Sequence, residues 1–124
     1  MIVVVDTSVV IDALRQVGPA TRYLERLPRR AVCSEVTRAE VWRGVRSQER
    51  DQTERLFEAI DWVHVDDVVS RRAGELGRTY RRSHPGLGLA DLLVAGTVVS
   101  LGAELATLNV RHFPMFPGLR PLYR

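Results

Sequence analysis

The sequence predicts an α/β fold with three layers, α/β/α, in which helices cover both faces of a central parallel sheet of four to five strands. Short apolar runs rich in β-branched residues alternate with longer segments whose apolar residues recur at helical spacing. The first run, residues 2–5, is apolar throughout, as expected of a strand buried on both faces. The length of 124 residues suits a single domain spanning residues 1–124.

Capping and breaking residues mark the elements of the first half. Ser8 is a suitable N-cap for a helix that runs towards Arg15, and Gly18-Pro19 ends that helix. A second helix follows before Pro28. The elements expected in this half, after the helix at Ser8, are a helix at 19–27, a strand at 31–34, helices at 36–45 and 49–60, and a short strand at 62–65.

Two long helices dominate the second half. The first begins at Asp66 or Asp67 and runs to about Ser83, with an apolar stripe at helical spacing. The second, at 89–101, is strongly apolar and is ended by Gly102. The stripe of the first helix is Val69, Ala73, Leu76 and Tyr80. The remaining elements expected are a strand at 104–108, one helical turn at 109–113 and a last strand at 119–122.

Composition favours a nucleic-acid partner and excludes several other classes of protein. The net charge is +3, and all 18 basic residues are Arg, whose planar side chain binds phosphate bidentately. A GC-rich genome explains the missing Lys equally well, but their absence excludes every mechanism that needs a Lys. The single cysteine, Cys33, lies in a short apolar run, so it forms no intramolecular disulfide and is expected in the core.

Apolar segments are too short for a membrane protein. No stretch approaches the roughly 20 apolar residues that span a bilayer. The apolar start, residues 1–5, lacks the length and the basic flank of a signal peptide. We therefore expect a cytoplasmic protein with no membrane segment.

Polar residues fall where two of the predicted strands end. Asp6 follows the first strand, and residues 107–109 follow the fourth. In parallel sheets covered by helices, ligands bind at the carboxyl ends of the strands. An alternative role for Asp6 is helix N-capping, although Thr7 or Ser8 could do this instead.

Asp91 lies near the start of the strongly apolar helix and is expected to face inward. A buried carboxylate is rare unless it is paired or bound to a metal, because desolvation costs several kcal/mol. The alternative is a first-turn carboxylate that interacts with the helix dipole, worth about 0.3–1 kcal/mol. The apolar stripe that Asp91 heads is Val94, Ala95, Val98 and Gly102, and the opposite, polar side is Gly96, Thr97 and Ser100.

Glu40 lies in the middle of the helix at 36–45, where a Glu is more often solvated. Together with Asp6 and Asp91, however, it could converge on one crevice. Two such charges about 5 Å apart repel by about 3 kcal/mol at an effective dielectric constant of 20. A divalent cation relieves this repulsion, and hard oxygen ligands favour Mg²⁺ or Mn²⁺. The sequence therefore predicts a metal-dependent active site at Asp6, Glu40 and Asp91.

Four segments in a fixed order carry a resemblance to a known family. They are Asp6-Thr7-Ser8, Ser34-Glu35-Val36-Thr37-Arg38-Ala39-Glu40-Val41, Gly88-Leu89-Ala90-Asp91-Leu92-Leu93-Val94-Ala95 and Ala106-Thr107-Leu108-Asn109-Val110-Arg111-His112-Phe113. Together they resemble a PIN domain, and specifically a VapC-type toxin of a type II toxin–antitoxin system. The resemblance covers almost the whole chain.

The resemblance implies a metal-dependent endoribonuclease that acts on structured RNA such as tRNA or rRNA. The acidic ligands of the family correspond to Asp6, Glu40 and Asp91. Thr7 and Thr107 would orient these carboxylates through hydrogen bonds. Many members have a fourth acidic residue after the fourth strand, where this chain has the amide Asn109. Asn109 would either hold a metal-bound water or leave a second metal weakly bound.

The resemblance also implies protein partners. A cognate VapB-type antitoxin is expected to cover the cleft, and the chain is expected to form a homodimer. Trp42 and Val45 are candidates for that interface, although Trp42 suits the core equally well. Asp12 is either a helper of the acidic site or a surface residue of the first helix.

Arginines of the helix at 66–83 are candidates for RNA binding. Arg71, Arg78 and Arg82 share one helical face and could contact phosphates, while the alternative is a solvated face. The three histidines form no close ligand pair in sequence: His84 precedes Pro85 in a loop, and His112 is expected to be structural.

Other readings of the sequence are weaker. A haloacid-dehalogenase-like phosphatase needs a second Asp where Ser8 stands and a late Lys, and a dinucleotide-binding module needs a Gly-rich turn after the first strand. The remaining alternative is a catalytically inactive PIN-type module that binds RNA or protein.

Overall fold

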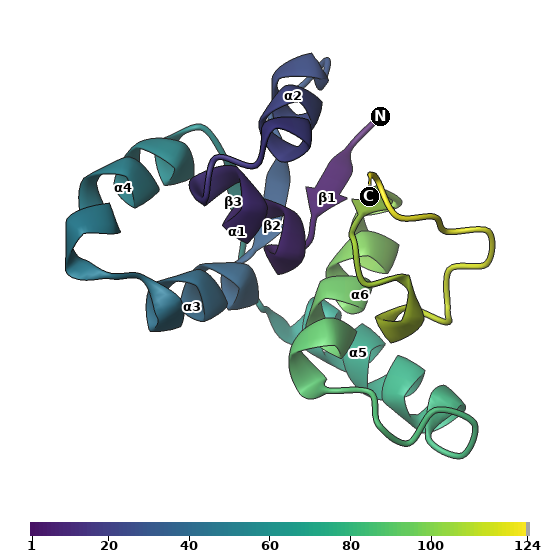
Figure 1. The fold of residues 1–124 in the computed structure, drawn as a ribbon. Coiled ribbons are helices and arrows are strands. Elements are labelled where there is room, and N and C mark those ends of the chain that lie inside the picture. Colours follow the sequence, from purple (N-terminus) through teal and green to yellow (C-terminus); the bar gives the residue numbers. More distant parts are fainter. Residues whose placement is uncertain (124) are drawn as a thin grey trace.

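A parallel β-sheet lies at the centre of the structure, a computed structural model that describes residues 1–123 (Figure 1). Within these residues the sheet has four strands in the order β3-β2-β1-β4. The strands are β1 (Val3–Val5), β2 (Val32–Ser34), β3 (Asp61–Val63) and β4 (Glu104–Ala106). The predicted α/β class and parallel sheet are confirmed.

Six α-helices flank this sheet in the part of the chain that the structure describes. They are α1 (Thr7–Leu14), α2 (Gly18–Arg26), α3 (Glu35–Gly44), α4 (Arg50–Glu58), α5 (Asp67–Tyr80) and α6 (Leu89–Leu101). Two short 3₁₀ helices, η1 (Ser47–Glu49) and η2 (Val110–His112), precede α4 and follow β4. No helix within residues 1–123 combines the length and the apolar content needed to cross a membrane.

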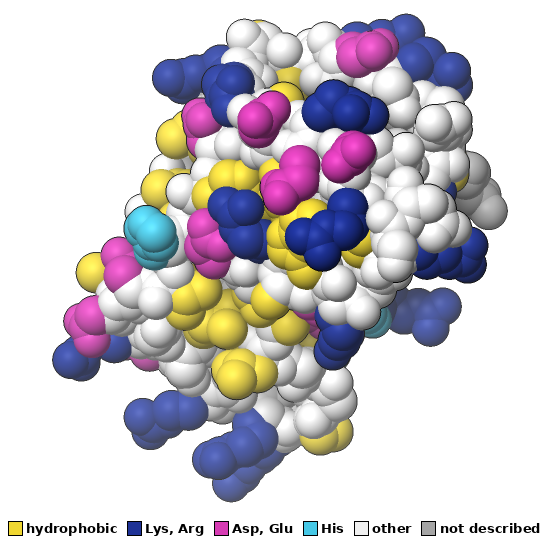
Figure 2. Space-filling view, turned by 90° about the vertical axis from the view of Figure 1, so that its left-hand side faces the viewer, with side chains coloured by type: hydrophobic (Ala, Val, Ile, Leu, Met, Phe, Trp, Pro, Cys, Tyr) yellow, Lys and Arg dark blue, Asp and Glu magenta, His cyan; other side chains and the backbone are white. Residues whose placement is uncertain are grey.

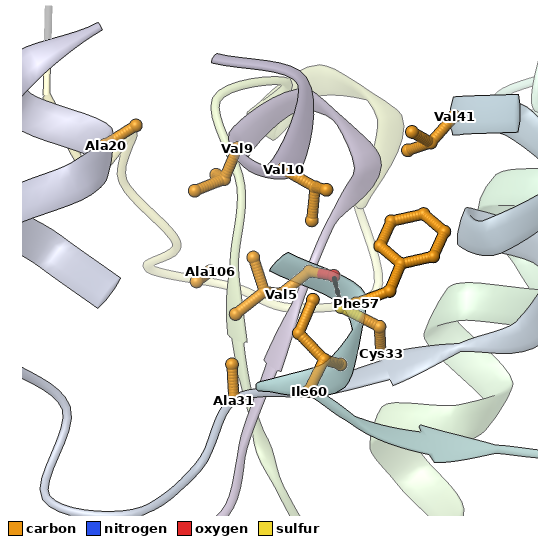
Figure 3. Close-up of a cluster of buried hydrophobic side chains, with 10 residues drawn as sticks. All are labelled: Val5, Val9, Val10, Ala20, Ala31, Cys33, Val41, Phe57, Ile60 and Ala106. Carbon is orange, nitrogen blue, oxygen red and sulfur yellow. Dashed lines mark hydrogen bonds between the residues drawn. The ribbon is translucent and has the colours of Figure 1, made fainter. Parts of the chain in front are cut away.

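Neighbouring residues of β1 face opposite sides of the sheet, and each enters a different core. Val5 packs with side chains from α1, α2, α3 and α4, several of which converge in Figure 3. Val4 packs instead with the apolar side chains of α6 and with Phe113. Helices α1 to α4 therefore cover one face of the sheet, and α6, backed by α5, covers the other (Figure 1).

Cys33 on β2 belongs to the first of these cores, as the sequence predicts. Its thiol is fully buried and donates to the carbonyl oxygen of Val5 at 3.4 Å. Burial raises the pKa of this thiol to about 12. Cys33 is therefore an inert core residue at physiological pH, because the thiolate is the reactive form.

The fifth strand expected at residues 119–122 is wrong. This segment is irregular, and a single backbone hydrogen bond, from Leu122 N–H to the carbonyl oxygen of Thr107 at 3.4 Å, connects it to the end of β4. Pro121 has no N–H to donate to a strand ladder. The apolar residues of the segment pack on the cores without extending the sheet.

Helix ends also differ from the expected ones. The helix expected at 49–60 begins at Arg50, directly after η1, and ends at Glu58. The helix expected to reach about Ser83 ends at Tyr80, and residues 81–83 form a turn ahead of Pro85.

The expected polar side of α6 is buried, which corrects the sequence interpretation of this helix. Gly96 and Thr97 are both buried, and α5 packs closely against Gly96. A Cβ atom on Gly96 would lie 2.8 Å from the carbonyl oxygen of Val69 and 3.0 Å from the amide nitrogen of Ala73. The Thr97 hydroxyl donates to the carbonyl oxygen of Leu93 at 2.8 Å, so it needs no partner outside its own helix. Close contact between α5 and α6 thus depends on Gly96.

Replacing Gly96 with Ala tests this contact. We expect Gly96→Ala to lower the free energy of unfolding by about 1–3 kcal/mol, because the added methyl meets backbone atoms that cannot move aside. Gly74→Ala on α5 is the matched control, since a Cβ there meets nothing within 4 Å. The free energy of unfolding of the control should rise by about 0.5–1 kcal/mol, because Ala favours the helix more than Gly does. Urea unfolding followed by circular dichroism measures both, and equal changes in the two variants would contradict the close packing at Gly96.

Candidate active site

Asp6 lies at the end of β1 and occupies the N-cap position of α1 in an extended backbone conformation. Its carboxylate does not cap the helix. Instead, Oδ2 accepts a hydrogen bond from the Thr107 hydroxyl at 2.7 Å and another from the Ser8 hydroxyl at 3.1 Å. The residue is only 3% exposed. The backbone of Asp6 thus begins the helix, while the carboxylate is held for another purpose.

Ser8 is not the N-cap that the sequence suggests. It lies inside α1, and its hydroxyl accepts a hydrogen bond from the backbone N–H of Leu108 at 3.2 Å while donating to Asp6. Local sequence cannot reveal this role, because Leu108 is 100 residues away. Ser8 therefore joins the start of α1 to the segment that follows β4.

Thr107 holds Asp6 because β4 is paired with β1. The strands are in register, and the ladder continues with the Asp6 N–H, which donates to the carbonyl oxygen of Ala106 at 2.9 Å. The next residue, Thr107, is fully buried, and its hydroxyl also accepts the N–H of Asn109 at 2.9 Å. The orienting role expected of Thr107 agrees with this geometry.

Glu40 on α3 is held by the residue that follows Asp6. The Thr7 hydroxyl donates to Glu40 Oε1 at 2.6 Å and lies 3.0 Å from the hydroxyl of the buried Thr37. Glu40 is partly buried rather than fully solvated. Thr37 is a supporting residue that sequence analysis missed. Its one local signal is the spacing of three residues from Glu40, which places both on the same helical face.

Asp91, in the first turn of α6, faces the same region from the other layer of helices. Its side chain is 27% exposed, and Oδ2 lies 3.1 Å from Nδ1 of His112. Burial raises the pKa of the Asp91 carboxyl; the neighbouring His112 lowers it, and the negative charges of Asp6 and Glu40 raise it. The charges of Asp6 and Glu40 therefore act on Asp91.

His112 is the second residue that sequence analysis missed. It was expected to be structural, and it does lie beside Phe113, which is buried in the second core. The structure places its ring against the carboxylate of Asp91. The two residues lie on different elements and 21 positions apart, so no local periodicity links them.

Each of the three carboxylates uses one oxygen for a contact within the protein. Asp6 Oδ2, Glu40 Oε1 and Asp91 Oδ2 face their partners, while the second oxygen of each has no hydrogen bond from residues 1–123. These free oxygens are hard ligands of the kind that Mg²⁺ and Mn²⁺ prefer. Among residues 1–123, no three acidic, His or Cys side chains lie close enough to hold one ion jointly. Mg²⁺ usually binds through one or two carboxylates and keeps several waters, so this donor set fits such an ion.

The other candidate residues lie around or away from this cluster. Asn109 is exposed at the N-cap of η2. Asp12 accepts a hydrogen bond from the Tyr123 hydroxyl at 2.9 Å, which connects it to the C-terminal segment. Trp42 and Val45 are partly buried against the first core.

The arginines expected to bind RNA do not contact the acidic residues. Arg71 lies on α5 and pairs with Asp67 at 2.9 Å, and the Arg71 side chain is 77% exposed. Arg78 is exposed near the end of the same helix, and Arg82 lies in the turn that follows. No hydrogen bond or ion pair joins these three side chains to Asp6, Glu40 or Asp91 in the described chain.

Comparison with known proteins identifies the family. The PIN domain family model matches residues 3–115. Ribonuclease VapC19 of Mycobacterium tuberculosis is 40% identical over 122 residues, which cover 96% of this chain and 98% of the relative. Ribonuclease VapC10 of the same species is 41% identical over 121 residues, covering 96% and 91%. The chain belongs to the VapC family of PIN-domain ribonuclease toxins.

Solved structures support the VapC fold. VapBC-1 from nontypeable Haemophilus influenzae contains a chain that is 27% identical, with a TM-score of 0.78 and coverage of 97% of this chain and 96% of that one. A toxin–antitoxin complex from Klebsiella pneumoniae gives a TM-score of 0.85 at 24% identity, with 98% of each chain covered. At its lower identity, the K. pneumoniae structure shows only that the two chains share a fold.

Removing the Thr107 hydroxyl tests how Asp6 is held. We expect Thr107→Val to lower the free energy of unfolding by about 1–3 kcal/mol, because the buried Asp6 carboxylate loses a hydrogen-bond donor and the Asn109 N–H loses its acceptor. Thr107→Ser keeps the hydroxyl, so its free energy of unfolding should fall by less. Urea unfolding measures the stability of both variants. A Thr107→Val protein as stable as the parent would contradict the role given to this hydroxyl.

Proposed function

We propose that this chain is a metal-dependent endoribonuclease that hydrolyses phosphodiester bonds in structured RNA, such as tRNA or rRNA, as the toxin of a toxin–antitoxin pair. The observation that carries the proposal is the trio of Asp6, Glu40 and Asp91, each held through one oxygen and free at the other. The names of the M. tuberculosis relatives support ribonuclease activity. VapC nucleases generally use a divalent metal, and Mg²⁺ or Mn²⁺ suits these carboxylates.

The residues of the site have different roles. One or two of Asp6, Glu40 and Asp91 would bind the ion directly, and the others would act through its bound waters. Thr7, Thr107 and His112 fix the direction of these carboxylates. When bound, a divalent ion makes a water molecule a better nucleophile at neutral pH and offsets charge on the phosphate. The exposed amide of Asn109 could orient a water molecule at the edge of the site, where many relatives have an acidic side chain.

Water is the nucleophile that this site favours. The one cysteine, Cys33, is buried with a pKa of about 12, so it cannot attack phosphate. Protein-held carboxylates near a scissile phosphate orient a water molecule and accept its proton. This chemistry needs no lysine, in agreement with the composition.

RNA would be held by arginines. Arg71, Arg78 and Arg82 on and after α5 are candidates for phosphate contacts, since they are exposed and positively charged. Asp67 partly offsets the charge of Arg71. We therefore expect Arg78 and Arg82 to contribute more to RNA affinity than Arg71 does.

A binding-only PIN module is the second candidate function. The observation in its favour is that no three acidic, His or Cys side chains in residues 1–123 are close enough to share an ion. The free carboxylate oxygens argue for the nuclease instead, because a protein that binds RNA without cleaving it gains nothing from negative charge beside the phosphate.

Asp91→Asn separates these two functions. We expect this variant to lose cleavage of total tRNA with Mn²⁺, to retain RNA affinity, and to show a smaller rise of Tm when Mn²⁺ is added, because a metal ligand is lost. The parent should gain about 2.7 kcal/mol at a Mn²⁺ concentration of 100 times Kd. Without metal, the variant should be at least as stable as the parent, since one of three repelling charges is gone.

Arg26→Gln, which removes an exposed charge on α2, serves as the control for Asp91→Asn. It should retain both cleavage and the Tm shift. Undiminished cleavage by Asp91→Asn would overturn the assignment of the active site. A parent protein that binds RNA but cleaves none, with no Tm shift in Mn²⁺, would favour the binding-only module.

An antitoxin is the expected protein partner, because free ribonuclease activity in the cytoplasm would damage the host. The H. influenzae neighbour is described as VapBC-1, and the K. pneumoniae neighbour as a toxin–antitoxin complex. Between α1, α2 and α4 lies a pocket of about 450 Å³. Leu14 lines both this pocket and a smaller one that contains Glu40. A VapB-type segment that fills this groove would reach the acidic site.

The surface near this groove is amphipathic. Figure 2 shows apolar patches between arginine and acidic side chains over the layer that contains α3 and α4. Trp42 and Val45 are partly exposed at the edge of the first core. A homodimer interface that includes them is part of the proposal.

Substitution within the groove tests the antitoxin site. Thr21 on α2 lines the larger pocket, so we expect Thr21→Arg to prevent co-purification with the antitoxin when both genes are expressed. Thr79→Arg on the exposed face of α5 makes the same change outside the groove and should retain the complex. The partner tested is the product of the small reading frame next to the gene. A chain that is soluble and harmless to its host when expressed alone would contradict the toxin–antitoxin proposal.

A further inference from the structure

We infer that a pocket beside Asp91 binds one nucleotide of the RNA, next to the scissile phosphate. The inference rests on the ribonuclease function proposed above and adds a site of recognition to it. The pocket has a volume of about 370 Å³, within the range of small-ligand sites. Its walls are Leu108, Asn109, Val110, Arg111, His112 and Pro121.

His112 connects this pocket to the acidic site. The ring lines the pocket, and its Nδ1 lies 3.1 Å from Asp91 Oδ2. A group in the pocket is therefore one side chain away from a carboxylate of the active site. The pocket that contains Glu40, by contrast, has a volume of only about 50 Å³, which is too small for a nucleotide.

The walls of the pocket suit the two halves of a nucleotide. Arg111 is exposed and forms no ion pair within residues 1–123, so its guanidinium is available for bidentate binding of phosphate. Leu108 and Val110 offer apolar surface to a base. The exposed amide of Asn109 has both donors and an acceptor, the combination that reads the polar edge of a base in single-stranded RNA.

Electrostatics gives a reason for a cation at this position. The carboxylates of Asp6, Glu40 and Asp91 repel phosphate, and some arginines elsewhere are already paired with acidic residues. Arg38 binds Glu35 at 2.6 Å, and Arg71 binds Asp67. Arg111 directly precedes His112 and can offset this repulsion beside Asp91.

The backbone of the pocket is fixed before any ligand binds. The Asn109 N–H donates to the Thr107 hydroxyl, and the His112 N–H donates to the carbonyl oxygen of Asn109 at 2.9 Å. Phe113, directly after the pocket residues, is 1% exposed in the second core. A preformed site loses less conformational entropy on binding, which favours recognition of a single nucleotide.

Nucleotide titration without metal tests the pocket directly. The probes are the 5′-monophosphates of adenosine, cytidine, guanosine and uridine, with inorganic phosphate as a fifth, added to the ¹⁵N-labelled full chain. We expect at least one nucleotide to shift the amide signals of residues 108–112. Arg111→Gln should weaken that binding about tenfold, the loss typical of one charge-assisted hydrogen bond.

Two further variants define the specificity of this result. Val110→Trp fills the pocket without changing charge and should also weaken nucleotide binding. Arg26→Gln removes a charge from α2, outside the pocket, and should bind like the parent. Absence of shifts at residues 108–112 with all four nucleotides would overturn the inference, as would inorganic phosphate that binds as tightly as the best nucleotide.

Cleavage kinetics separate failure of the pocket from failure of the proposed function. With Mn²⁺ and total tRNA, Arg111→Gln should raise KM about tenfold and change kcat much less, because the charge acts on binding. Unchanged KM in a variant of an active parent would overturn the pocket alone. A parent that cleaves no RNA would overturn the proposed function, and the nucleotide titration would then decide on the pocket independently.

Discussion

The proposed site requires three carboxylates to lie near one edge of the sheet although their charges repel one another. This repulsion affects Asp91: burial raises the pKa of its carboxyl, and the negative charges of Asp6 and Glu40 raise it further. In the structure, a polar side chain contacts one oxygen of each carboxylate. Because Thr107, Thr7 and His112 each come from another segment than the carboxylate they contact, tertiary structure holds the acidic residues in place.

The strand order makes this arrangement possible. β4 is the last strand in sequence but pairs with β1, so the residues that follow the two strands meet at the same edge. Glu40 comes from α3, on the face of the first core, whereas Asp91 comes from α6, on the face of the second. Asp6 follows the central strand between them. The proposed site therefore spans both helical layers, and both cores must be intact for it to form.

Local patterns were sufficient to predict the parts of the fold and the site that depend on neighbours in sequence. The apolar run before Asp6 identifies β1, and the long apolar stretch ended by Gly102 identifies α6 with the bounds observed. Thr7 and Thr107 entered through the family resemblance, and both hold the carboxylates of the site. The proposed site follows only from considering the acidic residues together.

Features that depend on distant partners were the ones that sequence analysis missed. His112 contacts Asp91 from another element, and Ser8 contacts the segment after β4, so neither role has a local pattern. Gly96 looked polar because helical periodicity alone cannot tell a solvated face from one covered by another helix. The apolar residues at 119–122 resembled a strand, although they serve the cores without pairing along the sheet.

The contact between α5 and α6 therefore matters for the chemistry, although it lies away from the carboxylates. Asp91 and Gly96 are on the same rigid helix, so any change that moves α6 away from α5 also moves Asp91 relative to His112 and Asp6. Apolar packing supplies the stability that tolerates repulsion among the acidic residues. A divalent ion bound to them would reduce this repulsion and add stability by mass action. Metal binding and the packing of α6 thus favour the same position of Asp91 at the edge of the sheet. The metal does so by reducing charge repulsion, and the packing does so by fixing α6 against α5.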